Sequence, residues 1–167
     1  MTTAEYLKAI LASQTLKEES PELTALREER EAVEKLLKEK FPDAKMTIRY
    51  GGSKAKGTMI LESYDLDIVC YFDHDDTSTG ETLEDIFNNV EKALATKYSV
   101  ERKTSALRLR SKEKVDFHID VVPGRFTDDK KSDAFLYIST GEKKRLKTNL
   151  RVPVHADHGF RSKPITD

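Results

Sequence analysis

Residues Arg49–Phe72 read RYGGSKAKGTMILESYDLDIVCYF, in which a Gly-Gly-Ser turn precedes two carboxylates, Asp65 and Asp67, one residue apart. Side chains along a strand alternate between its two faces and the chain rises ~3.3 Å per residue, so Asp65 and Asp67 are predicted to share a face with their Cα atoms ~7 Å apart. The apolar residues of the same strand then point toward a core. Two acids on one face of a half-buried strand are costly unless cations neutralise them. A pair of divalent ions, held ~3.5–4 Å apart in two-metal phosphoryl-transfer sites, is the natural candidate.

The Gly-Gly-Ser turn follows a predicted strand over residues 46–50, in which apolar side chains alternate. Ser53 is predicted to open a short helix directly after Gly51 and Gly52. The backbone N–H groups at a helix start, together with a Ser hydroxyl, form a site suited to phosphates, and glycines let a ligand approach the backbone closely. A glycine turn capped by Ser53 with nothing bound remains the alternative.

A third acid, Asp120, lies in a second alternating stretch, residues 115–121. This pattern predicts a strand that ends at Pro123–Gly124 and carries Asp120 on the face opposite the core. The adjacent His118 is interpreted as structural. Arg108 lies on the polar face of the preceding predicted strand, from which its side chain could reach a substrate.

These motifs resemble the signature of the polymerase-β-like nucleotidyltransferases. The resemblance rests on GGSKAKGTM, on Asp65-Leu66-Asp67 and on Asp120 within FHIDVVPG, and it covers roughly Ala44 to Pro123. It is nearest to the branch of oligoadenylate synthases and bacterial cyclic-oligonucleotide synthases, and to archaeal CCA-adding enzymes. The resemblance implies an α+β fold, with a mixed, mainly antiparallel sheet and helices packed on one of its faces.

The resemblance also implies a reaction, in which a hydroxyl attacks the α-phosphate of a nucleoside triphosphate and pyrophosphate leaves. The expected cofactor is Mg²⁺, with Mn²⁺ as a substitute, because hard oxygen ligands suit both ions. The implied metal-binding and catalytic residues are Asp65, Asp67 and Asp120. The implied nucleotide-binding residues are Gly52, Ser53 and Lys56. Arg108 is added to the nucleotide-binding residues because of its position on the polar face of its strand.

Several functions fit these motifs. The leading hypothesis is a nucleotidyltransferase of the oligonucleotide-synthase type, acting on a nucleotide or RNA acceptor. The alternatives are a CCA-adding or other tRNA nucleotidyltransferase, a minimal antitoxin-type enzyme that modifies a protein, and a non-catalytic module that binds nucleotide or RNA.

Three regions are expected along the chain. Residues 1–42 are predicted to form two helices, over about 2–14 and 20–40, that pack on the catalytic domain; residues 43–152 form the catalytic core, with a further helix over 81–98; and residues 153–167 form a tail. The resembling enzymes carry a helical domain after this sheet. The chain is therefore expected to be a catalytic-domain fragment, a minimal enzyme, or a protein whose site is completed by a helical domain or partner protein.

Composition limits the remaining possibilities. The chain has 167 residues, enough to bury a core as one domain. No apolar run approaches the ~20 residues of a membrane span, and no signal peptide is evident. A single cysteine, Cys70, is consistent with a reducing cytoplasm. Residues 102–163 contain 16 Lys and Arg against 8 Asp and Glu, and this basic half favours polyanionic partners such as triphosphates or RNA.

Overall fold

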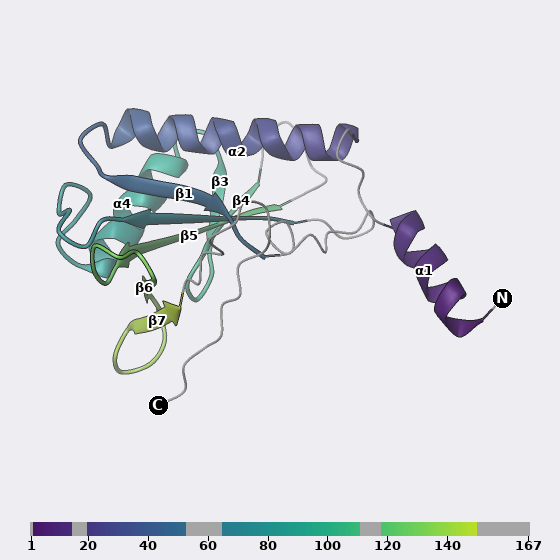
Figure 1. Ribbon diagram of the computed structural model, residues 1–167. Coiled ribbons are helices and arrows are strands. Elements are labelled where there is room, and N and C mark those ends of the chain that lie inside the picture. The colour runs from purple at the N-terminus through teal and green to yellow at the C-terminus, as the bar shows by residue number, and fades with distance from the viewer. Residues whose placement is uncertain (1, 15–19, 53–64, 111–117, 150–167) are drawn as a thin grey trace.

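The computed structural model describes residues 2–14, 20–52, 65–110 and 118–149, and it shows a sheet with helices on one face (Figure 1). The described helices are α1 (Thr3–Gln14), α2 (Pro21–Lys40) and α4 (Leu83–Leu94). The described strands are β1 (Met46–Tyr50), β2 (Leu66–Phe72), β3 (Ser99–Arg102), β4 (Leu107–Arg110), β5 (His118–Phe126), β6 (Asp133–Tyr137) and β7 (Arg145–Asn149).

The strands form one mixed sheet in the order β1-β2-β5-β4-β3, with β6 and then β7 added beside β5. Only the pairing between β2 and β5 is parallel among the described strands, and the other pairs are antiparallel. The predicted α+β fold with a mixed, mainly antiparallel sheet is therefore confirmed. The strands β3 and β7 were not anticipated, because neither has a clear apolar alternation: β3 is mostly exposed and β7 is rich in basic residues.

Strand β5 is longer than its sequence predicts, and the expected end at Pro123–Gly124 is wrong. The strand continues to Phe126 because it changes partners along its length. β4 pairs with it as far as Val121, and β6 begins to pair at Gly124. Proline has no N–H to donate, and Pro123 lies in the gap between these two partners, where no ladder bond is required on that side.

The core lies between one face of the sheet and the helices α2 and α4. Along β2 and β5, buried residues alternate with half-buried ones, so that Leu66 and Ile68 face the core together with Ile119 and Val121. The helix α2 begins with Ser20, whose hydroxyl accepts a hydrogen bond from the backbone N–H of Leu23 at 3.2 Å, as expected for an N-cap before proline. The apolar stripe of α2 contributes Leu23, Leu26, Val33 and Leu37 to this core.

The helix α4 ends at Leu94, earlier than the predicted residue 98. The residues after it form a turn that buries Tyr98, whose hydroxyl donates to Glu29 on α2 at 3.3 Å. Burial and the nearby Glu29 raise the pKa of Tyr98, so this phenol stays protonated. The turn therefore connects α4 to α2 through this hydrogen bond.

None of the described helices is long and apolar enough to cross a membrane.

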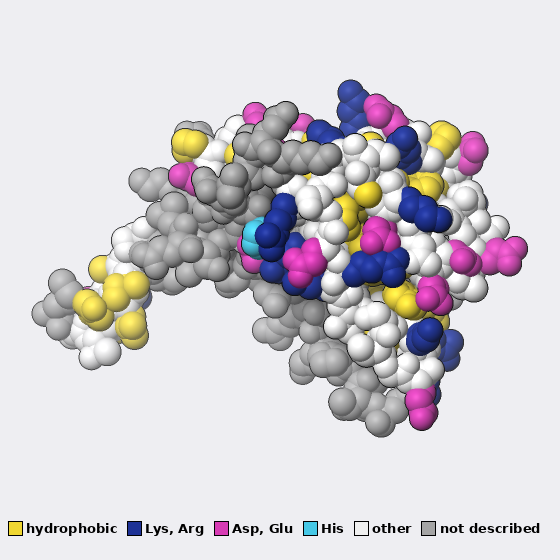
Figure 2. Space-filling view, turned by 180° about the vertical axis from the view of Figure 1, so that it is seen from behind, with side chains coloured by type: hydrophobic (Ala, Val, Ile, Leu, Met, Phe, Trp, Pro, Cys, Tyr) yellow, Lys and Arg dark blue, Asp and Glu magenta, His cyan; other side chains and the backbone are white. Residues whose placement is uncertain are grey.

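The helix α1 forms as predicted, with reciprocal bonds between Thr2 and Glu5 at its start, but it does not pack on the sheet. Figure 1 shows it projecting away from the rest of the molecule, and Figure 2 shows hydrophobic side chains on this projection. Tyr6, Leu7 and Ile10 are 55%, 59% and 41% exposed. Among the described elements, α2 therefore packs against the core and α1 does not, while the expected division of the chain into regions stays a prediction. An apolar pattern indicates which face of a helix avoids water, and it does not identify what covers that face.

The different burial of the two N-terminal helices predicts different costs of truncation. Leu26 on α2 is fully buried, so Leu26→Ala should lower the free energy of unfolding by ~2–5 kcal/mol. Leu7→Ala on α1 is the matched control and should change it by no more than ~0.5 kcal/mol. Urea denaturation of both variants checks this, and an equal loss would mean that α1 packs on the domain after all.

Candidate active site

Two of the predicted acids lie side by side on the sheet. In the parallel pairing of β2 with β5, Asp67 is directly opposite Asp120. Both are half-buried and alternate with core residues, so both lie on the face that the helices do not cover. Neighbouring strands are ~4.8 Å apart, so the pairing brings two carboxylates from distant parts of the chain to adjacent positions.

The same row of residues continues across the next two strands. Arg108 on β4 is the register partner of Asp120, and Glu101 on β3 is the register partner of Arg108. The row therefore reads acid, acid, base, acid across β2, β5, β4 and β3. Glu101 also has partners outside the row, because Lys103 and Arg110 lie 2.6 Å and 3.5 Å from its carboxylate.

Arg108 and Asp120 form a bidentate ion pair. The guanidinium Nε donates to Oδ1 at 2.8 Å, and Nη2 donates to Oδ2 at 2.7 Å. The side chains of Arg108 and Asp120 are 25% and 16% exposed, so solvent screens the pair only in part. The hydrogen bonds to Asp120, with added attraction from the charges of Asp120 and Asp65, raise the pKa of Arg108 above its usual range.

Asp65 lies just before β2 and is exposed. Its charge is one of the lesser causes of the raised pKa of Arg108, and it lies two residues before Asp67 in the chain. Among the described residues, however, no three acidic, His or Cys side chains are arranged to hold a metal ion. The strand pairing thus brings Asp67 and Asp120 together, while the side chain of Asp120 is engaged by Arg108.

The glycine turn packs directly against Asp67. The backbone N–H of Gly51 donates to the Asp67 carbonyl at 2.8 Å. Gly52 has a φ of 52°, a conformation that favours glycine, and a Cβ added there would lie 1.5 Å from Oδ2 of Asp67. Two features therefore favour glycine at position 52: its positive φ and the Asp67 carboxylate that lies where a side chain would be. Ser53 and Lys56, the other predicted residues of this turn, lie outside the described residues.

The ion pair between Arg108 and Asp120 was missed by sequence reasoning, which had assigned Arg108 to the nucleotide alone. Nothing in the sequence indicates which residue of β4 is opposite which residue of β5.

His118, interpreted as structural, has a buried Nδ1 that has no hydrogen-bond partner in the part of the chain described.

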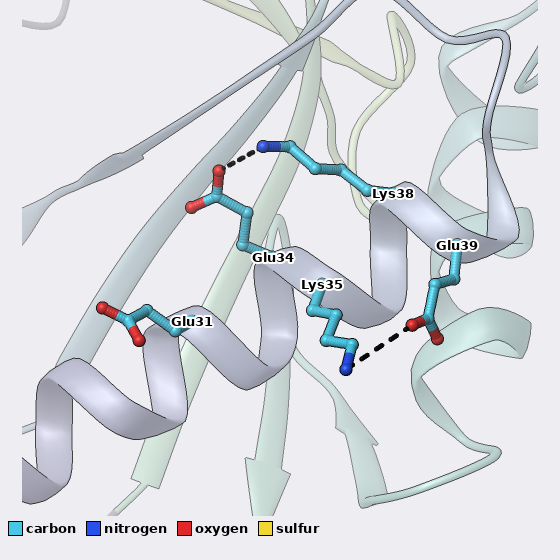
Figure 3. A pocket seen from close by; sticks show the side chains of 5 residues that line it. All are labelled: Glu31, Glu34, Lys35, Lys38 and Glu39. Carbon is cyan, nitrogen blue, oxygen red and sulfur yellow. Dashed lines mark hydrogen bonds and ion pairs between the residues drawn. The ribbon is translucent and has the colours of Figure 1, made fainter.

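Three other charged features are accounted for by local contacts. In the acidic loop after β2, Asp76 accepts hydrogen bonds from the backbone of Ser78 and Lys45, as a structural cap. A shallow depression along α2 is lined by Glu and Lys side chains, and Figure 3 shows the pairs that Lys38 forms with Glu34 and Lys35 with Glu39. In the basic cluster near β7, Lys147 pairs with Asp133 at 3.1 Å and Arg145 stacks over Phe135.

The contact between Gly52 and Asp67 makes a prediction about stability. Gly52→Ala combines backbone strain with a clash against the carboxylate, whereas Gly141→Ala, at a φ of 91° with no atom within 4 Å of the new Cβ, has strain alone. Strain of this kind costs ~1–3 kcal/mol. Chemical denaturation should therefore show a larger loss for Gly52→Ala than for the control, and equal losses would place the Asp67 carboxylate elsewhere.

Comparison with known proteins gives the family of this chain. A family model described as "Second Messenger Oligonucleotide or Dinucleotide Synthetase domain" matches residues 1–149. No curated protein matches the sequence.

Solved structures with the same fold include three bacterial proteins. The Elizabethkingia meningoseptica CdnE cyclic dinucleotide synthase, with GTP and Apcpp, aligns over 98% of this chain and 55% of its own length, with a TM-score of 0.59 and 18% identity. E. coli MS115-1 CdnC with ATP aligns over 89% and 48%, with a TM-score of 0.61 and 18% identity. Bradyrhizobium diazoefficiens CD-NTase CdnG with GTP aligns over 82% and 41%, with a TM-score of 0.58 and 20% identity.

These similarities extend over most of the present chain and about half of each neighbour. At 18–20% identity they establish the fold, and the family model establishes the membership. The chain belongs to the family of second messenger oligonucleotide or dinucleotide synthetase domains, and its fold is that of the polymerase-β-like nucleotidyltransferases.

Proposed function

We propose that the chain is the catalytic domain of a Mg²⁺-dependent nucleotidyltransferase of the oligonucleotide-synthase type. It transfers a nucleoside monophosphate from a triphosphate to a hydroxyl and releases pyrophosphate. The observation that carries this proposal is the register of Asp67 against Asp120, two carboxylates held side by side in a domain of a synthetase family. The proposed catalytic residues are Asp65, Asp67 and Asp120.

The donor set fits the proposed metal in its chemistry. Asp65, Asp67 and Asp120 offer only carboxylate oxygens, which Mg²⁺ and Mn²⁺ prefer. Asp67 and Asp120 are register partners on the sheet, and Asp65 lies two residues before Asp67. Among the residues that the structure describes, these side chains do not form a three-ligand group. When bound, divalent ions supply charge that stabilises the phosphoryl group and that activates an attacking oxygen.

The protein's own residues would position the substrate around this row. Gly52 lets the turn lie directly against Asp67, because the place that a side chain would take is filled by the Asp67 carboxylate. We assign phosphate binding to Gly52 with Ser53 and Lys56, and we assign to Arg108 a further contact with the triphosphate. Asp120 would face the acceptor hydroxyl and accept its proton, since a carboxylate within hydrogen-bond reach can act as a general base.

The ligands of the structural neighbours support a triphosphate substrate: GTP and Apcpp with CdnE, ATP with CdnC, and GTP with CdnG. The chain covers about half the length of these proteins. We therefore propose that residues 43–152 form the catalytic core, with residues 1–42 before it and 153–167 as a tail, and that a helical domain or partner protein completes the nucleotide site. One neighbour, E. coli CdnC, is solved in a complex with HORMA-deltaN.

Nucleotidyl transfer can be tested on the 167-residue protein directly. Each α-³²P-labelled triphosphate is incubated with Mg²⁺ or Mn²⁺, with and without RNA, and the products are resolved by thin-layer chromatography and gel electrophoresis. We expect oligonucleotide products. Asp67→Asn and Asp120→Asn should each lower the rate at least about 100-fold, the scale set by loss of one oriented charged group in a phosphoryl-transfer site.

Asp129→Asn is the control, because the side chain of Asp129 is 94% exposed and contacts His74 Nδ1 at 3.5 Å, away from the row of charges. It should leave the rate unchanged. Asp67→Asn should also leave the thermal midpoint unchanged or slightly higher, since it removes one of two adjacent negative charges. A large loss of stability would instead make Asp67 a structural residue.

The products also separate the alternatives. Extension of tRNA would indicate the CCA-adding activity, and label on protein would indicate an antitoxin-type enzyme. Triphosphate binding without any product, under all of these conditions, would indicate a non-catalytic module.

A further inference from the structure

The pairing of Arg108 with Asp120 conflicts with metal binding by Asp120. Both carboxylate oxygens already accept a hydrogen bond from the guanidinium, at 2.8 Å and 2.7 Å. This is the bidentate geometry in which arginine recognises carboxylate most strongly. An ion that binds Asp120 must therefore share its oxygens with a fixed cation, or replace it.

Sharing is unfavourable for electrostatic reasons. A guanidinium does not lose its proton in proteins, so Arg108 cannot relieve the repulsion by becoming neutral. A single and a double positive charge ~4–5 Å apart repel strongly where screening is incomplete, and these two side chains are only 25% and 16% exposed. This repulsion favours movement of Arg108 away from Asp120 when a divalent ion binds.

The neighbouring acids are poor alternative partners for a displaced Arg108. Glu101, its register partner on β3, is already paired with Lys103 and lies near Arg110. Asp65 is itself a proposed metal ligand. The triphosphate brings several negative charges to the same face, and arginine binds phosphate oxygens in the bidentate manner that it uses for carboxylates.

We propose that Arg108 is an exchangeable counter-ion: it neutralises Asp120 in the metal-free protein and transfers to the phosphates of the substrate when Asp120 takes up a divalent ion. This inference rests on the proposed function and deepens it. It makes Arg108 a positioning residue that couples metal binding to nucleotide binding, so that metal alone binds weakly and metal with triphosphate binds well.

The proposal predicts that Arg108→Gln strengthens the binding of metal alone and weakens the binding of nucleotide with metal. Mn²⁺ binding without nucleotide can be measured by electron paramagnetic resonance at about pH 7.5. It should become about tenfold tighter or more, because the guanidinium that competes for Asp120 is gone. Binding of ATP with Mg²⁺, measured by calorimetry, should become about tenfold weaker, because a phosphate contact is lost. A role confined to nucleotide binding would leave the Mn²⁺ affinity unchanged, and a purely structural role would weaken both.

Arg110→Gln is the matched control. Arg110 lies two residues along the same strand and, like Arg108, is near Glu101, but its register partner is His118. Neither affinity should change by more than about twofold in this variant. If Arg108→Gln fails to fold, Arg108→Lys retains the charge and loses the bidentate fork, and it should tighten Mn²⁺ binding to a smaller extent.

Asp120→Asn separates failure of this inference from failure of the proposed function. If Asp120→Asn does not weaken Mn²⁺ binding in the presence of ATP, when Arg108 has left Asp120, then Asp120 is not a metal ligand and the proposed site itself is wrong. If Asp120→Asn weakens it but neither Arg108 variant tightens it, the metal site stands and the exchange by Arg108 is overturned.

Discussion

The parallel pairing of β2 with β5 is the constraint on which the site depends. It sets Asp67 against Asp120, and two carboxylates on adjacent strands repel each other. The fold accepts this cost because β4 places Arg108 against Asp120 on the other side of β5. Their attraction, of the same order at hydrogen-bond distance, offsets the repulsion. On β5, Asp120 thus lies between the like charge of Asp67 on β2 and the opposite charge of Arg108 on β4.

The rest of the fold keeps that row in place. On the opposite face, Leu66, Ile68, Ile119 and Val121 are buried under α2 and α4, so neither strand can slip by one residue without exposing its core side chains. The change of partner at Pro123 lets β5 remain long enough to pair with β2 along its whole length. Gly52 brings the turn after β1 against Asp67 from a second direction.

The helix α1 exposes apolar side chains, and the structural neighbours are longer than this chain. The chain spans about half of each neighbour, and the hydrophobic side chains of α1 face away from the described core. The described domain contains the row of charges that would act on phosphates. In our proposal, groups that distinguish one base from another come from a further domain or a partner protein.

Local pattern in the sequence was sufficient to predict the helices α1 and α2, the strands β1 and β2, and the faces on which Asp67 and Asp120 lie, because alternation and capping act over a few residues. The acid-x-acid motif and the glycine turn are local features, and they point to the family from the sequence alone. Only the tertiary structure decided that Asp67 is opposite Asp120, that Arg108 occupies both oxygens of Asp120, and that α1 stands apart. These features depend on register between strands distant in the sequence and on which surfaces meet, and both are set by long-range hydrogen bonds and packing that no local pattern encodes.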